Sequence, residues 1–244
     1  MPVTILITRP EPEAGRFAAR LRAVCGPGVD VLCAPVMRIV TEGQLPPLSG
    51  QEVLIFTSRH GVAGFCQLTA RRDFTCYAVG EATAEAARAQ GLTAIACGGD
   101  AEALLDRIAR DGTTGPFLHL RGAHVAADIT GALRTAGHDA TDAVVYDQQA
   151  QDMGAAARRV LAAEGPVILA LMSPRSARLV FSQAGHIHAP LFVAAISRKV
   201  AEAVPEGAAQ KLSIAQRPDA EAMAEAVQDL VKKAKRLEGG KRAQ

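Results

Sequence analysis

Hydrophobic and polar positions follow one repeating pattern along most of the chain. Short, nearly continuous apolar runs, such as VLIF at 53–56 and VILAL at 167–171, are each followed by a longer stretch whose apolar positions recur with the period of a helix. Continuous apolar runs are typical of strands that are covered on both faces. The pattern therefore predicts parallel sheets flanked by helices, which is an α/β fold.

The same pattern sets the expected boundaries of the elements. Apolar runs predict strands over 3–8, 29–33, 52–57, 75–79, 93–96, 116–120, 166–171, 191–195 and 211–214. Periodic stretches predict helices over 12–24, 60–69, 82–90, 100–110, 124–136, 152–164, 175–184, 198–204 and 218–234. Strands and helices that alternate in this way favour three-layer, flavodoxin-like or Rossmann-like domains.

The chain contains an internal repeat. VLIFTSRHGVAGF at 53–65 and VILALMSPRSARLVF at 167–181 both end a strand near a serine and then begin a helix. A second strand–helix unit follows each, and then DAEALLDRI at 100–108 or DAEAMAEAV at 219–227. Ser58 and Gly80 are 22 residues apart, whereas Ser173 and Ser197 are 24 apart. Units in the same order with matched spacing indicate two related domains.

A fourth strand–helix unit indicates which parts of the chain form each domain. FLHLRGAHVAADITGALRTAG at 117–137 has its counterpart at the N-terminus, in TILITRPEPEAGRFAARLRAV, with Arg9 and Arg121 each following a strand and opening a helix. The N-terminal unit should thus complete the C-terminal domain. We expect one domain from 1–33 plus 150–244, an inserted domain at 42–141, a two-stranded β hinge from 34–41 and 142–149, and a disordered basic tail over about 235–244.

Composition narrows the class of protein. Hydrophobic residues make up 49% of the 244 residues, so a packed core is feasible. Aromatic residues are only 4% and the net charge is +2, which count against base-stacking nucleic-acid modules. No apolar run approaches 18 residues, and no signal peptide is visible. Five cysteines without a CxxC pair favour a reducing compartment, so we expect a cytoplasmic protein.

Familiar catalytic and cofactor motifs are absent. The sequence has no GxGxxG, GxxxxGK[ST], GxSxG or HExxH pattern, and the HIH at 186–188 is expected to be a surface loop before Pro190. We therefore predict neither a cofactor nor a metal. A ligand would be held by shape and hydrogen bonds.

Candidate binding residues lie where strands end and helices begin. Helix N-termini with hydroxyl groups and arginines bind anions such as carboxylates, although ordinary helix capping explains the same serines and threonines. Tyr146, in the second crossing, could donate a hydrogen bond to a leaving group, or could simply pack in the hinge. The other candidates are Arg9, Thr57, Ser58, Gly80, Thr83, Arg121, Ser173, Ser176 and Ser197.

Several of these segments together resemble the uroporphyrinogen-III synthase family. The resemblance covers roughly residues 3–230 and depends on the order of its motifs, since each is weak alone. They are ILITRP, the P-x-x-x-I of Pro35–Ile39, LIFTSRHGV, YAVGEATA, DAEALL, LHLRG, VVY, LMSPRSA, AAIS and PDAEAM. The resemblance implies a cofactor-free lyase of tetrapyrrole (heme) synthesis, which cyclises hydroxymethylbilane to uroporphyrinogen III with loss of water and inversion of the last ring.

The resemblance also implies roles for residues. Thr83 and Tyr146 become candidates for assisting loss of the hydroxyl group, and a cleft between the domains would bind the substrate. It would be lined by Thr57, Ser58, Arg121, Gly122, Ser173 and Ser197. One departure is ISRKVA at 196–201, where many members resemble IGxxTA. We expect a monomer with transient contact to the preceding pathway enzyme. A non-catalytic hinged protein that binds or responds to an anionic ligand remains the alternative.

Overall fold

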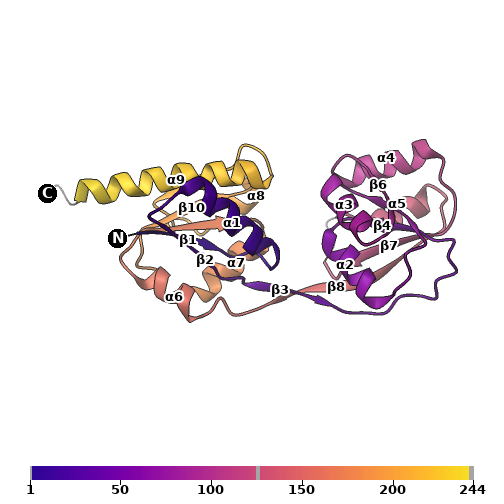
Figure 1. Ribbon diagram of the computed structural model, residues 1–244, viewed down its shortest axis with the longest axis horizontal. Helices are drawn as coiled ribbons and strands as arrows, with labels where there is room; N and C mark the ends of the chain where they lie inside the picture. Colours follow the sequence, from indigo (N-terminus) through magenta and orange to yellow (C-terminus); the bar gives the residue numbers. More distant parts are fainter. Residues whose placement is uncertain (1, 125–126, 242–244) are drawn as a thin grey trace. The chain divides into compact units, whose positions relative to one another are not determined.

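The computed structural model describes residues 2–124 and 127–241, and the chain divides into two compact units. Unit 1 consists of Met1–Arg38 and Ala150–Gln244, and unit 2 consists of Ile39–Gln149. Each unit has its own sheet with helices on both faces (Figure 1). The predicted α/β class is thereby confirmed.

Unit 1 has a five-stranded sheet in the order β11-β10-β9-β1-β2, and all of its pairings are parallel. Its strands are β1 (Val3–Ile7), β2 (Val29–Cys33), β9 (Val167–Leu171), β10 (Leu191–Ala195) and β11 (Lys211–Ile214). Its helices are α1 (Glu13–Cys25), α6 (Ala155–Ala162), α7 (Pro174–Gln183), α8 (Arg198–Ala201) and α9 (Ala220–Lys241).

Unit 2 has a six-stranded sheet in the order β3-β8-β7-β4-β5-β6. Its strands are β3 (Met37–Thr41), β4 (Val53–Phe56), β5 (Thr75–Ala78), β6 (Thr93–Ala96), β7 (Phe117–Gly122) and β8 (Ala140–Ala150). Its helices are α2 (Arg59–Leu68), α3 (Glu81–Ala89), α4 (Ala101–Asp111) and α5 (Ile129–Thr135). Strands β4 to β8 pair in parallel.

The segments expected to cross between the domains are both strands. β3 lies beside β8 in the sheet, and hydrogen bonds flank this pair at Glu42 N to Val145 O and at Gln151 N to Val36 O. The residue numbers of these partners rise on one strand as they fall on the other, so β3 runs antiparallel to β8.

The two units are circular permutations of one strand order. Read from its other edge, the sheet of unit 2 has the parallel order β6-β5-β4-β7-β8, which matches β11-β10-β9-β1-β2 in unit 1. The strands β7 and β8 thus correspond to β1 and β2, although they come last in unit 2 and first in unit 1. This arrangement confirms the internal repeat that the sequence predicts. The extra strand of unit 2 is β3 at the edge.

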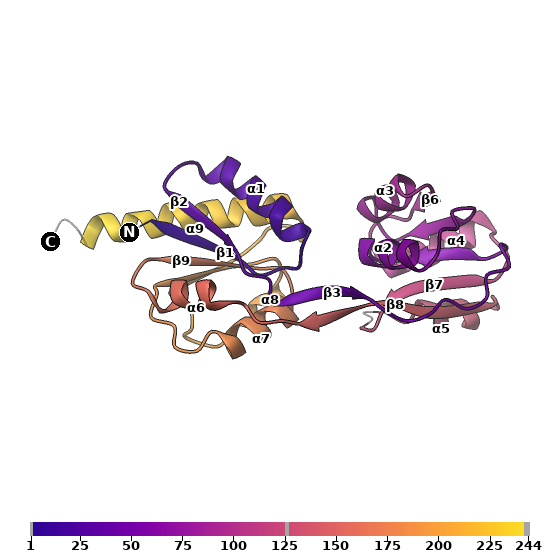
Figure 2. The ribbon, with the colours of Figure 1, turned by 60° about the horizontal axis from the view of Figure 1, so that its bottom comes forward.

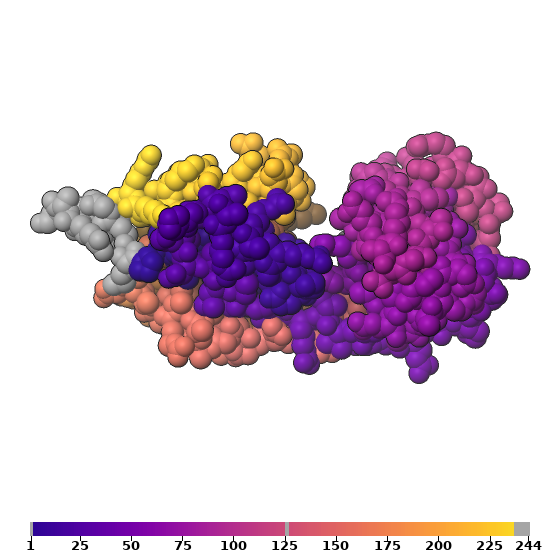
Figure 3. Space-filling view, in the orientation of Figure 1, coloured from indigo at the N-terminus to yellow at the C-terminus, as the bar shows by residue number. Residues whose placement is uncertain are grey.

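Each sheet is buried on both faces by apolar side chains, which explains the continuous apolar runs. In unit 1, α1 and α9 pack side by side on one face, and α6, α7 and α8 cover the other (Figures 2 and 3). In unit 2, α2 and α3 cover one face and α4 and α5 the other. The carboxyl ends of the parallel strands remain at one edge of each sheet.

Several predicted boundaries were wrong. α6, predicted over 152–164, spans only Ala155–Ala162. α5 begins at Ile129 instead of 124, because Asp128 caps it by accepting a hydrogen bond from Gly131 N at 2.8 Å. Arg121 therefore lies inside β7, and Arg9 likewise precedes the start of α1 at Glu13, so neither arginine opens a helix.

Two further corrections concern helix ends. α9 continues to Lys241, whereas we predicted a helix that ends at 234. Its buried residues Leu230, Val231 and Ala234 lie in the predicted part of the helix. Disorder from about 235 stays a prediction. Residues 242–244 of the predicted tail lie outside the described residues. α8 ends at Ala201 instead of 204, because the residue before Pro205 is biased against helical geometry.

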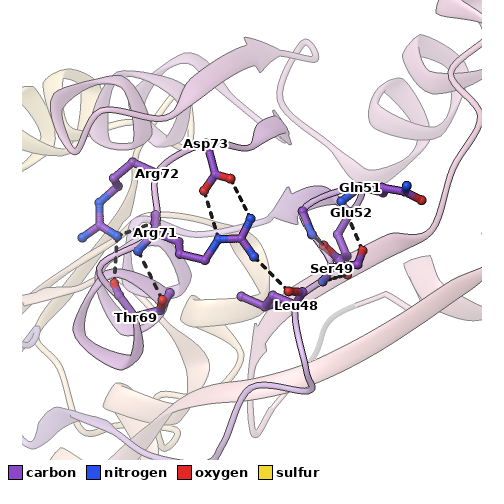
Figure 4. A network of polar contacts seen from close by, with 9 residues as sticks. Leu48, Ser49, Gln51, Glu52, Thr69, Arg71, Arg72 and Asp73 are labelled. Atoms are coloured by element: carbon purple, nitrogen blue, oxygen red, sulfur yellow. Dashed lines mark hydrogen bonds and ion pairs between the residues drawn. The ribbon is translucent and has the colours of Figure 1, made fainter.

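The segment that leads into β4 is held by side chains instead of secondary structure (Figure 4). Arg71 Nη1 donates to Leu48 O at 2.9 Å, and Arg71 also pairs with the Asp73 carboxylate at 2.6 Å. Glu52 accepts two hydrogen bonds from Ser49, each at 2.8 Å. Although burial acts to raise the pKa of Glu52, these hydrogen bonds, together with those from the backbone N–H groups of Gly50 and Glu52, lower it to about 2. The segment is thus fixed by charge-assisted hydrogen bonds.

Candidate active site

The two predicted strand–serine–helix corners have matching backbone geometry. Ser58 has φ −153° and ψ 147°, and its Oγ accepts a hydrogen bond from His60 N at 3.1 Å at the start of α2. Ser173 has φ −153° and ψ 151°, and its Oγ accepts from Ser176 N at 3.0 Å at the start of α7. Both serines therefore cap helices, and capping explains their presence without reference to a ligand.

The next corner of each unit is also matched. Gly80 and Ser197 occupy the N-cap positions of α3 and α8 in extended conformations, and neither helix has a side-chain cap. Thr83 lies in the first turn of α3 and is only 8% exposed. In unit 1 the buried Ser176 hydroxyl lies 2.8 Å from that of Ser173. Arg9 follows β1 and is partly buried.

A cavity of about 510 Å³ lies at the carboxyl edge of the unit 2 sheet. Five predicted residues line it: Thr57, Ser58, Arg121, Gly122 and Tyr146. Thr83 and Gly80 are not among its lining residues, although both lie in the same unit. The wall also contains residues that sequence reasoning did not propose as binding residues, namely Val79, Asp100, Ala101, His119, His124, Ala127, Ile129 and Gln148.

Tyr146 is held against the backbone of Gly122. The two residues pair across β7 and β8 at a register shift after Arg121, which is a β-bulge. A Cβ atom at position 122 would lie 2.7 Å from Tyr146 Cζ, so only glycine lets the ring lie this close. Tyr146 is 6% exposed, and its ring centroid is 5.6 Å from that of His60. The phenol is thus fixed in the cavity wall.

Hydrogen bonding polarises the Tyr146 hydroxyl. Burial raises the pKa of Tyr146, and a hydrogen bond with the Ser58 hydroxyl lowers it in part. Since this hydrogen bond lowers the pKa, Ser58 donates and the phenol oxygen accepts, while Ser58 Oγ itself accepts from His60 N. A phenol that accepts such a bond is a stronger donor to a third group. Tyr146 stays protonated at neutral pH and can donate to a ligand.

Arg121 is partly neutralised by an ion pair. Its Nε donates to Asp142 Oδ2 at 2.6 Å, and its Nη1 donates to Gly122 O at 3.1 Å. The two side chains are 25% and 30% exposed. Asp100 Oδ1 accepts from Ala103 N at 2.8 Å as the cap of α4. The cavity therefore combines one paired arginine with several hydrogen-bonding groups.

His119 is the most unusual residue of the wall. It is 3% exposed, and its Nε2 atom is buried without a hydrogen-bond partner among the described residues. Burial lowers the pKa of His119 to about 4, while the carboxylates of Asp142 and Asp128 act in the opposite direction. The imidazole is therefore neutral near pH 7. The available signal was a histidine inside the apolar run FLHL, which we did not use.

No metal site is formed by the described residues, in which no group of three or more His, Cys, Asp and Glu side chains comes together. The HIH segment lies in a loop, as predicted, with His186 and His188 exposed and their rings 6.4 Å apart. Over residues 2–124 and 127–241, no helix has both the length and the apolar character needed to cross a membrane.

The fold and the cavity define a class of protein: an α/β protein of two permuted units with mostly parallel sheets, and with a tyrosine-containing cavity where the strands of one unit end. A family model described as uroporphyrinogen-III synthase HemD matches residues 16–225, which is more than half of the chain. The chain belongs to the uroporphyrinogen-III synthase family.

Solved structures agree with this assignment at the level of the fold. The chain is similar to a uroporphyrinogen-III synthetase from Helicobacter pylori, with a TM-score of 0.68 and 17% identity over 94% of this chain and 100% of that one. It is also similar to a mutant uroporphyrinogen III synthase from Thermus thermophilus, with a TM-score of 0.51 and 15% identity over 97% and 99%. The sequence matched none of the curated proteins with which it was compared.

Membership of the family establishes the reaction. The chain is a cyclising lyase of tetrapyrrole (heme) biosynthesis, and its substrate is the linear tetrapyrrole hydroxymethylbilane. The reaction closes the ring with loss of water and inversion of the last pyrrole, which gives uroporphyrinogen III.

Proposed function

We propose that the cavity of unit 2 binds the hydroxymethyl end of the substrate and that Tyr146 assists departure of its hydroxyl group. The observation that supports this proposal is the buried phenol, fixed between Gly122 and Ser58 in the wall of the cavity. A hydroxyl group leaves more easily when its oxygen accepts a hydrogen bond as the C–O bond breaks.

The charges around the cavity suit the expected intermediate. The hydroxyl group takes up a proton from solvent, departs as water, and leaves a positively charged azafulvene. The carboxylates of Asp100 and Asp142 lie in and beside the wall, and they would stabilise positive charge. Because burial raises the pKa of Tyr146, its role is to donate a hydrogen bond while the phenol itself stays protonated.

The remaining predicted residues are proposed to bind the carboxylates and the chain of the substrate. The substrate carries eight carboxylates, and helix N-termini at matched corners offer N–H groups to such anions. Thr83 stays a candidate for assisting hydroxyl loss, although it is not among the residues of the cavity wall. The proposed binding residues are Arg9, Thr57, Ser58, Gly80, Arg121, Gly122, Ser173, Ser176 and Ser197. Closure of the two units over one substrate molecule also stays a prediction.

The two tyrosines of the chain make a matched pair for the test. Tyr146→Phe removes the hydroxyl group in the cavity. Tyr77→Phe removes a hydroxyl that bonds Asp111 at 2.9 Å and Thr113 at 2.6 Å, outside the cavity wall. Each protein would receive freshly generated hydroxymethylbilane, and the type I and type III isomers of the product would be resolved.

We expect Tyr146→Phe to lower the rate of type III formation by roughly 100-fold, the lower end of the range for acid–base groups, with little change in KM. Tyr77→Phe should keep the wild-type rate and lose only stability. Equal rates in both variants would remove Tyr146 from the reaction. A wild-type protein that leaves the isomer ratio unchanged would favour a non-catalytic binding protein.

We further propose that the enzyme acts as a cytoplasmic monomer that receives its unstable substrate by transient contact with the preceding enzyme. All five cysteines are free thiols, which is expected in a reducing compartment. Each unit also has its own apolar clusters on both faces of its sheet. Sedimentation equilibrium tests the monomer, since a dimeric mass at micromolar concentration would contradict it.

A further inference from the structure

The internal repeat indicates which type of side chain is sufficient for packing at position 119. Ile55 pairs with His119 in unit 2, and Ala170 pairs with Ile7 in unit 1. Ile55 and Ala170 both lie three residues before the serine that caps the next helix, so His119 and Ile7 are equivalent. Ile7 is fully buried. An aliphatic side chain therefore satisfies this position, and packing alone does not require histidine.

Histidine at this position should make the fold less stable than isoleucine would. His119 is 3% exposed, and its Nε2 is buried without a partner among the described residues. A buried polar atom without a hydrogen bond destabilises a protein. Because the His119 side chain lines the cavity, a ligand that reaches the ring could supply the missing partner.

The surroundings indicate what kind of partner fits. Arg121, on the same strand, is already paired with Asp142 of β8. Asp128, at the start of α5, is a second carboxylate close enough to act on the imidazole, and Asp100 caps α4 in the cavity wall. Around the His119 ring these carboxylates outnumber the arginine, which at this point of the wall favours an N–H donor over a carboxylate.

We propose that His119 is a substrate-binding residue whose neutral imidazole accepts a hydrogen bond from a pyrrole N–H group of the bound tetrapyrrole. This inference rests on the proposed function of the cavity. A neutral imidazole has one nitrogen that accepts a hydrogen bond, and each pyrrole ring of the substrate has one N–H to donate. The contact would orient a ring beside the Tyr146 phenol.

Two substitutions separate this role from a structural one. His119→Ile recreates the residue of the other unit, and His119→Gln keeps a side-chain acceptor of similar reach. We expect His119→Ile to fold, to melt no lower than the wild type, and to lose roughly 10-fold in kcat/KM for type III formation, mainly through KM. His119→Gln should recover most of this loss.

The outcomes are distinct from those for the proposed function. If the wild type forms the type III isomer and His119→Ile matches it in kcat/KM, the inference is wrong while the function stands. A wild type that forms only the type I isomer removes the function itself. Equal losses in the two variants would also contradict the inference, since glutamine retains the acceptor.

A spectroscopic measurement covers the case in which His119→Ile does not fold. The wild-type protein, labelled with ¹⁵N at its six histidines, is titrated with reduced uroporphyrinogen III. The His119 signals are assigned by their absence from the spectrum of His119→Gln. We expect an unprotonated His119 nitrogen whose resonance moves on binding. A resonance that does not move, or an imidazole that becomes doubly protonated, overturns the proposal.

Discussion

Substitution of Gly122 by alanine tests whether the reaction depends on the placement of the Tyr146 phenol. The new Cβ atom would lie 2.7 Å from Cζ, 2.8 Å from Cε2 and 3.0 Å from the hydroxyl oxygen of Tyr146. Non-bonded carbon atoms prefer about 3.5–4.0 Å, so the ring has to move by about 1 Å. Since the ring is 6% exposed and packed in an apolar cluster, its neighbours must move as well.

The size of the effect follows from this overlap. Overpacking of a core costs about 1–3 kcal/mol, which should lower the melting temperature of unit 2 by several degrees. A misplacement of about 1 Å at a reacting centre can cost roughly 100-fold in rate. We therefore expect Gly122→Ala to fold, to melt earlier, and to lose most type III formation in the isomer assay.

Two further variants show whether the loss acts through the phenol. Gly15→Ala, on the exposed side of α1, places its Cβ no closer than 3.4 Å to a flexible Glu11 oxygen and should keep wild-type activity. In a double-mutant cycle, Gly122→Ala should have little further effect on rate once Tyr146 is phenylalanine, while its effect on stability persists. Rate losses that add fully, or a Gly122→Ala protein that matches the wild type, would refute the reasoning.

Two other predictions concern stability. Burial lowers the pKa of His119 from 6.5 to about 4, so between these pH values the unfolded state binds more protons than the folded state. The free energy of unfolding should therefore fall as the pH drops from 6.5 toward 4. The contribution of this histidine is at most about 3 kcal/mol. Urea titrations at several pH values should show this dependence in the wild type and its loss in His119→Ile; the same slope in both proteins would count against it. Ser58→Ala and Ser173→Ala should each lower the free energy of unfolding by about 1 kcal/mol, because each removes a helix cap. Only Ser58→Ala should also raise the pKa of Tyr146, which is measured by ultraviolet titration of the phenol. An unchanged phenol pKa in Ser58→Ala would contradict the hydrogen bond between the two hydroxyls.

The sequence was informative wherever a property depends on residues that are close together along the chain. Apolar runs such as VLIF and VILAL located buried strands, and Ser58 and Ser173 marked helix starts, because periodicity and capping act over a few residues. The repeat of these units revealed two related domains. Local patterns gave no information where a distant contact decides the outcome, as in the ion pair of Arg121 with Asp142.

Only some residues of the candidate site could be predicted from the sequence. Thr57, Ser58, Arg121, Gly122 and Tyr146 were recognised from their segments, and all five line one cavity. His119 was missed, because a histidine in an apolar run gives no sign of whether its nitrogen finds a partner. The ion pair of Arg121 with Asp142 was also missed, since 21 residues separate them and only the alignment of β7 and β8 brings them together.

The amino-acid sequence by itself thus determined the order of strands and helices, the duplication and the family, since each is written in short-range patterns and in their succession. The tertiary structure alone decided which side chains meet: Gly122 against Tyr146, Ser58 with the phenol, and a neutral His119 beside a neutralised arginine. The physical reason is that strand register and burial set distances and pKa values, and both depend on residues far apart in the chain.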